Sequence, residues 1–192
     1  DISISTDQKF LKSKNEDIYF SIKRIHDQIN TEAAKKSVIN LKSYRDSLLQ
    51  EDFIKLIKTL PREYLSEFRK GTQWLTNLGT QKVTNEVQNS KIVGFFDINK
   101  ISEKLDVKQL LLIDVFDQLV DQRSGIWNRR KTVFFYSKYI KERIDEINLI
   151  SDEQEKQNQI NQVSKKLNID RKHILSKIDE NLKLIAEEIK QK

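Results

Sequence analysis

Glycine and proline are scarce in this chain. Its 192 residues include four Gly and one Pro, whereas Lys, Ile, Asn and Glu are frequent. Helices accept most residue types other than Gly and Pro, so this composition favours helix over most of the length. Apolar residues also recur every three or four positions, which is the period of an amphipathic helix. The sequence therefore predicts an all-α, single-domain bundle of about seven to eight helices over residues 1–192.

The expected helices follow one another with few breaks. A short extended pairing is expected only around 91–96, and no internal repeat is apparent. The most apolar helix, 107–121, is expected to bury Leu112, Phe116 and Leu119. Because the chain becomes more polar beyond residue 151, that position is the candidate hinge. The helices are expected over about 7–29, 31–48, 53–60, 61–79, 98–105, 107–121 and 126–150, with two more after 151.

Most of the side chains that serve catalysis are missing. With no Cys and two His, the chain offers no thiol nucleophile, no metal cluster and no Gly-rich phosphate loop. Asp114, Asp117 and Asp121 share a helix face and could be interpreted as a metal or acid–base site. No His and no second acidic cluster accompany them. We therefore expect no enzymatic activity, no cofactor and no metal, and assign no catalytic residue.

The densest basic cluster provides the candidate interaction surface. It consists of Arg129, Arg130 and Lys131, with Trp127 and Arg123 nearby. Such a cluster could hold a phosphate, an anionic lipid headgroup or an acidic protein surface. The alternative is a solvated face whose charges pair with the aspartates of the preceding helix. The net charge of +6 comes from interspersed charges of both signs, which is typical of a soluble surface rather than a nucleic-acid footprint.

A second candidate surface lies near the C-terminus. Residues 163–174 resemble the helix-turn-helix family, with Ser164 as the small residue, Leu167 as the packing residue and Asn168 in the turn. Ile169 and Ile174 would form the core between the two helices. This resemblance implies nucleic-acid binding through Arg171, Lys172 and His173.

The segment also departs from that motif. Asn168 stands where Gly is usual, and Lys177 takes an apolar position. Asp170 and Asp179 flank the supposed recognition helix, which disfavours contact with phosphates. From the sequence we predict that duplex DNA binds weakly or not at all at physiological salt.

The composition of the whole chain supplies one further resemblance. Stretches such as 165–169 and 182–190, together with the lack of Cys and Met, resemble all-helical outer-surface lipoproteins and exported proteins encoded on plasmids of Lyme-type (Borrelia-like) spirochaetes. The resemblance implies a bacterial helical bundle at the cell surface, or secreted from it, that contacts host or vector molecules. We therefore expect a non-enzymatic protein that binds a protein partner.

The location of the protein is less constrained by the residues. No apolar run approaches the length of a membrane span, while a signal segment or lipid anchor upstream of Asp1 stays open. Lack of Cys fits a reducing cytoplasm as well as a bacterial surface. We expect a cell-surface or extracellular location, with the cytoplasm as the alternative.

Overall fold

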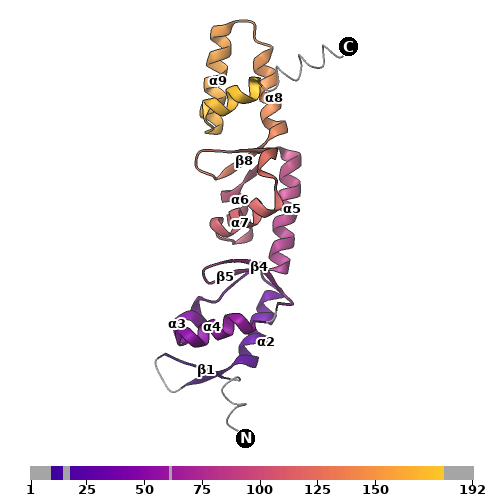
Figure 1. Cartoon of the computed structure of the whole chain (residues 1–192). Coiled ribbons are helices and arrows are strands. Elements are labelled where there is room, and N and C mark those ends of the chain that lie inside the picture. The colour runs from indigo at the N-terminus through magenta and orange to yellow at the C-terminus, as the bar shows by residue number, and fades with distance from the viewer. Residues whose placement is uncertain (1–9, 15–17, 61, 180–192) are drawn as a thin grey trace. The chain divides into compact units, whose positions relative to one another are not determined.

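The protein has a mixed α/β fold (Figure 1), in a computed structural model that describes residues 10–14, 18–60 and 62–179. Helices alternate with short strands, which pair into a two-stranded sheet and two three-stranded sheets, all antiparallel. The expected all-α helical bundle is therefore wrong. The strands are mostly three or four residues long and adjoin helices directly, so their apolar residues continue the helical stripes in the sequence.

Short strands and helices follow one another in both halves of the chain. The first half contains β1 (Phe10–Lys12), β2 (Tyr19–Ser21), α2 (Ile22–Ala33), β3 (Val38–Asn40), α3 (Lys42–Ser47), α4 (Gln50–Thr59), β4 (Leu65–Lys70), β5 (Gln73–Thr76) and α5 (Asn77–Val93). The second half contains β6 (Phe95–Asp97), α6 (Ile98–Leu105), α7 (Gln109–Leu119), the 3-10 helix η1 (Gln122–Ser124), β7 (Gly125–Trp127), β8 (Val133–Tyr136), α8 (Ser137–Asn148) and α9 (Glu153–Leu167). A further helix covers 171–179.

The order of elements repeats along the chain. A strand, two helices, a β-hairpin and a helix run from β3 to α5, and the same succession runs from β6 to α8. The strand orders match as well, β3-β5-β4 in one sheet and β6-β8-β7 in the other. Ile39 lies opposite Trp74 in the first sheet, and Phe96 lies opposite Phe134 in the second. The chain thus contains the internal repeat that its sequence does not show.

Backbone hydrogen bonds outside the strand ladders confirm this repeat. In each copy the residue at the start of the first helix donates its N–H to the hairpin turn, and the last residue of the hairpin donates to the residue before the first strand. The four donor–acceptor pairs are Leu41 to Thr72 (2.8 Å), Ile98 to Thr132 (2.8 Å), Thr76 to Ser37 (3.0 Å) and Tyr136 to Gly94 (2.9 Å).

Helix α2 precedes the first copy. From α2 to β5, a helix and a strand lead into two helices and a β-hairpin, whose second strand pairs with β3. We call this hairpin, and its counterpart β7–β8 in the second copy, the wing. The turn of the wing contains Gly71, whose φ of +62° is a conformation that glycine adopts without strain. The elements α5 to β8 follow the same order along the chain.

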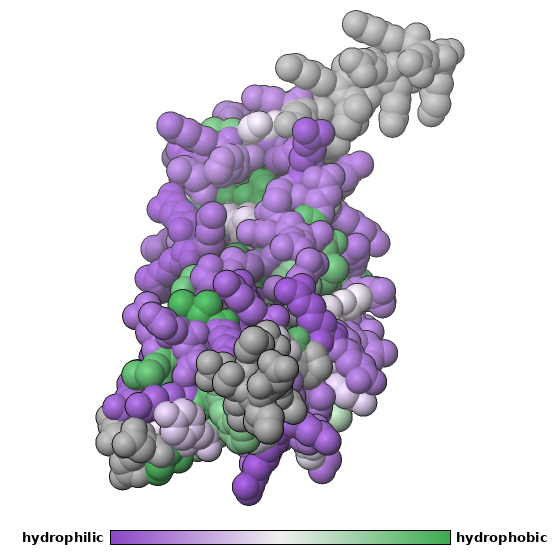
Figure 2. Space-filling view, turned by 60° about the horizontal axis from the view of Figure 1, so that its bottom comes forward, coloured by the Kyte–Doolittle hydropathy of each residue, from purple (hydrophilic) through white to green (hydrophobic). Residues whose placement is uncertain are grey.

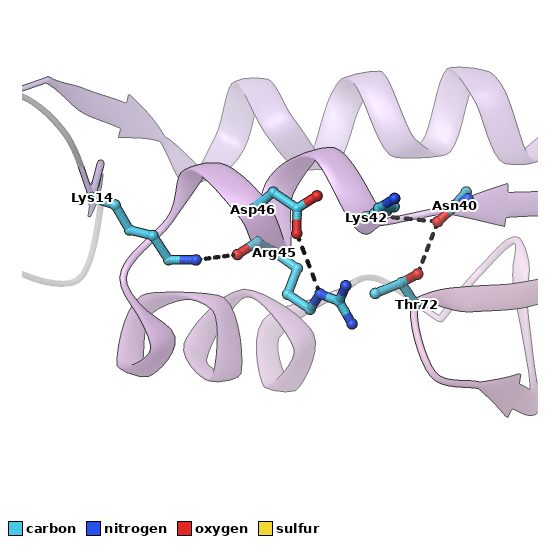
Figure 3. A network of polar contacts seen from close by, with 6 residues as sticks. All are labelled: Lys14, Asn40, Lys42, Arg45, Asp46 and Thr72. Atoms are coloured by element: carbon cyan, nitrogen blue, oxygen red, sulfur yellow. Dashed lines mark hydrogen bonds and ion pairs between the residues drawn. The ribbon is translucent and has the colours of Figure 1, made fainter.

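A polar network fixes the wing of the first copy (Figure 3). The side-chain oxygen of Asn40, at the end of β3, accepts the backbone N–H of Lys42 (3.0 Å) and the hydroxyl of Thr72 (2.9 Å). This one side chain ties the strand to the start of α3 and to the turn between β4 and β5. In the second copy Asp97 ends β6 and accepts the N–H of Lys100 in α6 (3.2 Å). Asp97 thus caps the start of α6.

The chain divides into two compact units. One contains residues 1–85 and 101–116, and the other contains residues 86–100 and 117–192. The first has a hydrophobic core that includes Ile29, Ile39, Leu56 and Trp74. The core of the second includes Phe135, Ile140, Ile144, Ile160 and Ile174. Within the described residues, no helix is long and apolar enough to cross a membrane.

Some expected helices are correct and others are strands. The helix expected over 98–105 has those bounds, and the one expected over 53–60 overlaps α4. The helices expected over 61–79 and 126–150 begin instead with the hairpins β4–β5 and β7–β8. Strand β8 consists of aromatic and β-branched residues, and β5 contains Trp74 and Thr76; these residue types favour strands. The expected hinge at residue 151 falls between α8 and α9.

Burial in α7 matches two of the three residues expected there. Leu112 and Phe116 are completely buried, whereas Leu119 is 38% exposed. Leu119 is the last residue of α7, where the helix ends and solvent reaches the side chain. The expected burial of Leu119 is therefore wrong.

We predict that Phe116→Ala lowers the free energy of unfolding by about 3–5 kcal/mol, because it leaves a cavity in place of a fully buried ring. Leu119→Ala serves as the control in the same helix and costs less than about 1.5 kcal/mol, because its side chain is partly exposed. Urea denaturation followed by circular dichroism measures both. Equal losses for the two variants would contradict the packing described for α7.

Candidate functional site

A helix-turn-helix lies where the sequence predicts one. Helix α9 ends at Leu167, Asn168 is left-handed with φ +53°, and the next helix covers 171–179. Ile169 and Ile174 are both buried. Asn replaces the usual Gly because its short polar side chain tolerates the left-handed conformation. The segment thus consists of two helices joined by a turn in which Asn168 is left-handed and Ile169 is buried.

The same turn occurs a second time, between α6 and α7. Leu105 ends α6, Asp106 has φ +52°, and Val107 is buried. In both turns a serine hydroxyl donates to the carbonyl of the buried β-branched residue and the serine carbonyl accepts that residue's N–H. The pairs are Ser102 with Val107 (2.7 and 3.1 Å) and Ser164 with Ile169 (2.8 and 3.1 Å). The sequence carries this signal as Ser-x-Lys-Leu-Asp/Asn-Val/Ile at 102–107 and 164–169.

The basic cluster of the sequence forms the tip of the second wing. Asn128, at the end of β7, is buried, and its amide group donates to the Thr132 hydroxyl (2.9 Å) and accepts the Thr132 N–H (2.8 Å). These bonds close the turn between β7 and β8. Arg129, Arg130 and Lys131 lie in this turn and are all exposed. Asn128 therefore holds three consecutive cations in solvent.

The two candidate surfaces, which the sequence separates by about forty residues, meet in the second unit. The backbone N–H of Arg129 donates to the carbonyl of Asn168 at 2.9 Å. The Arg129 guanidinium also lies 3.8 Å from a carboxylate oxygen of Asp170. Because both ionic side chains are more than half exposed, the ion pair adds little stability. The backbone hydrogen bond is the contact that places the wing tip against the turn.

The other candidate residues differ in their surroundings. Trp127 is half-buried, donates its indole N–H to Gln122 (2.9 Å), and packs edge-on against Phe134 at 5.3 Å between ring centroids. Trp127 is thus part of the wing's packing. Arg123 is exposed in η1, and Arg171 donates to the side chain of Gln157. Lys172 and His173 are exposed in the first turn of the 171–179 helix.

The three aspartates in and just after α7, Asp114, Asp117 and Asp121, each contact a different residue. Asp114 forms an ion pair with Lys70 at 2.9 Å, and Asp117 accepts a hydrogen bond from the Gln122 amide at 3.0 Å. Asp121 caps η1 by accepting the N–H of Arg123 at 2.9 Å. These contacts are made to three separate residues, all of which lie outside the wing turn at 129–131.

No protein-family model matches the chain, and no curated protein matches it. The resemblance to spirochaete surface proteins therefore stays a prediction based on composition. The internal repeat and the twice-used turn provide the firmest basis for a functional interpretation.

We predict that Asn168→Val destabilises the protein by about 1–2 kcal/mol, because a β-branched residue is strained in the left-handed conformation. Asn168→Gly stays within about 1 kcal/mol of the wild type, since Gly adopts this conformation readily. Asn161→Val is the matched control at an exposed, regular position of α9, where Asn and Val have similar helix propensities. Thermal unfolding compares the three variants. A loss at Asn161 as large as that at Asn168 would contradict the assignment of strain to the turn.

Proposed function

We propose that the chain is a non-enzymatic binding module and that helix α7 contacts a protein partner. The observation that carries this proposal is the composition of α7, which exposes apolar and acidic residues and contains no Lys or Arg. As the second helix of a helix-turn-helix, α7 occupies the position that meets the ligand in domains of this type.

The exposed side chains of α7 form a stripe. Leu110, Ile113, Asp114 and Asp117 are spaced at i, i+3, i+4 and i+7, which places them on one helix face. Leu110 is 62% exposed, and Ile113 and Asp114 are partly exposed. A patch of exposed apolar residues with polar residues at its rim is typical of a protein-interaction site.

The charge of this stripe argues against nucleic acid at α7. Helices that enter a DNA groove approach phosphates closely and carry Arg, Lys or polar side chains to contact them. Asp117 would instead be repelled by phosphates, while Asp114 is already paired with Lys70. A protein surface with an apolar patch beside a Lys or Arg complements Leu110 and Asp117. The partner of α7 is thus proposed to be basic and apolar at its contact face.

Other apolar residues are exposed as well, among them the neighbours Ile92 (87%) and Val93 (58%) at the end of α5. Most of the face drawn in Figure 2 is hydrophilic, with small hydrophobic areas between. Leu149, at the end of α8, is 84% exposed but lies outside any helix-turn-helix and provides a reference position. The cell-surface location and the host origin of the partner stay predictions from composition.

A photo-crosslinking residue at position 110 tests the proposal. In cells that produce the chain, we expect position 110 to capture a partner that the same residue at position 149 does not capture. The captured protein is then purified and its binding measured by calorimetry. Leu110→Asp is expected to raise Kd at least about tenfold, which is about 1.4 kcal/mol, because it places a charge in the apolar contact.

Leu149→Asp is the matched control, since it introduces the same charge at a leucine that is even more exposed, at 84% against 62%. We expect it to leave Kd unchanged. Asp117→Lys is expected to weaken binding as well, and more at low salt than at high salt, because it removes charge attraction. Equal capture at positions 110 and 149, or a Kd that Leu110→Asp does not change, would exclude α7 as the contact.

A further inference from the structure

We propose that the wing tip and the start of the 171–179 helix form one surface that binds the phosphodiester backbone of a duplex nucleic acid. This joint basic surface consists of Arg129, Arg130, Lys131, Arg171 and Lys172. It is separate from α7 and is independent of the protein partner proposed above.

The structure holds the two parts of this surface together at a backbone contact. The 2.9 Å hydrogen bond from the Arg129 N–H to the Asn168 carbonyl joins the wing to the turn that precedes Arg171. Asn128 closes the wing turn through its hydrogen bonds to Thr132. The left-handed conformation of Asn168 forms the turn between α9 and the 171–179 helix. The cations are therefore carried by ordered backbone, which reduces the entropy lost when they bind phosphates.

The charge of the surface is strongly one-sided. Residues 129–131 supply three cations and residues 171 and 172 supply two, while Asp170, which directly precedes Arg171, is acidic. Asp170 lies beside Arg129, which offsets part of its charge. The five side chains of the joint basic surface are all exposed. Such a concentration of positive charge attracts phosphates and releases the cations condensed on a nucleic acid.

The arrangement also matches how this kind of fold approaches a duplex. A helix-turn-helix presents the N-terminal residues of its second helix to the groove, while other elements contact the backbone. Lys172 and His173 lie in that first turn, and the wing adds Arg130 and Lys131 beside it. The N-terminus of the 171–179 helix contributes a further partial positive charge toward a phosphate.

The structure changes how the charges near the turn are weighed for and against phosphate binding. From the sequence, Asp170 counts against phosphate binding, but in the structure its carboxylate lies beside the guanidinium of Arg129. Lys177, which stands where the motif is usually apolar, is partly buried while Ile174 and Ile178 complete the packing. The wing brings three cations that the helix-turn-helix does not contain. After the turn between α6 and α7, the positions that correspond to Arg171 and Lys172 are occupied by Gln109 and Leu110, the first two residues of α7.

The test is a fluorescence-anisotropy titration of the full chain with labelled duplex DNA and duplex RNA, from about 50 to about 200 mM salt. We expect binding that weakens steeply as salt rises. The double variants Arg130→Ala/Lys131→Ala and Arg171→Ala/Lys172→Ala are each expected to lower affinity at least about tenfold. Each is also expected to reduce the slope of log K against log salt by up to about 1.8.

Lys35→Ala/Lys42→Ala is the matched control, because it removes two exposed lysines from the first unit and changes the net charge equally. Circular dichroism confirms that each variant is folded. Tighter binding of DNA or of RNA identifies the natural source of the phosphodiester and supports the proposal either way. Binding of neither duplex at low salt, or equal losses in the control variant, would overturn it, while leaving the partner of α7 unaffected.

Discussion

The central strand of each three-stranded sheet is the element on which the rest of its repeat depends. β5 pairs with β3 and β4, and β8 pairs with β6 and β7. Strands this short are marginal alone, so each sheet is stable only with hydrogen bonds on both edges of the middle strand and side-chain burial. Trp74 and Phe134 occupy matching positions of these strands and are buried. In each sheet, the hairpin and the first strand of the copy therefore stabilise one another.

The sequence predicts the helices better than the strands, for a physical reason. Helix α6 has a clear N-cap at Asp97 and a clear apolar stripe, so its bounds follow from local signals. All the strands but β4 take up only three or four residues, too few to establish an alternating pattern. Leu65, Phe68 and Leu75 have helical spacing but belong to two paired strands, because contacts between distant residues override the local preference.

At the candidate site, too, the features set by neighbouring residues can be predicted from the sequence, whereas the contacts between distant residues cannot. Ser164, Leu167 and Asn168 mark a turn that local sequence identifies, since left-handed Asn and buried β-branched residues are local requirements. The meeting of Arg129 with Asn168 depends on a hydrogen bond between residues 39 positions apart, which no spacing rule indicates. The second copy of the turn, at Asp106, is detectable from the shared Ser-x-Lys-Leu pattern, but the repeat is short and its flanking residues differ.

The two turns explain how one frame can support two kinds of contact. The residues that build each turn are the serine, the leucine, the left-handed Asp or Asn, and the buried Val or Ile, and they are nearly the same in both. The residues that follow play no part in the turn and are exposed, so they vary without cost to the fold. In α7 they are Gln109 and Leu110, whereas in the 171–179 helix they are Arg171 and Lys172. An apolar, acidic face and a basic face thus arise from the same local geometry, because the exposed residues differ while the residues that build the turn do not.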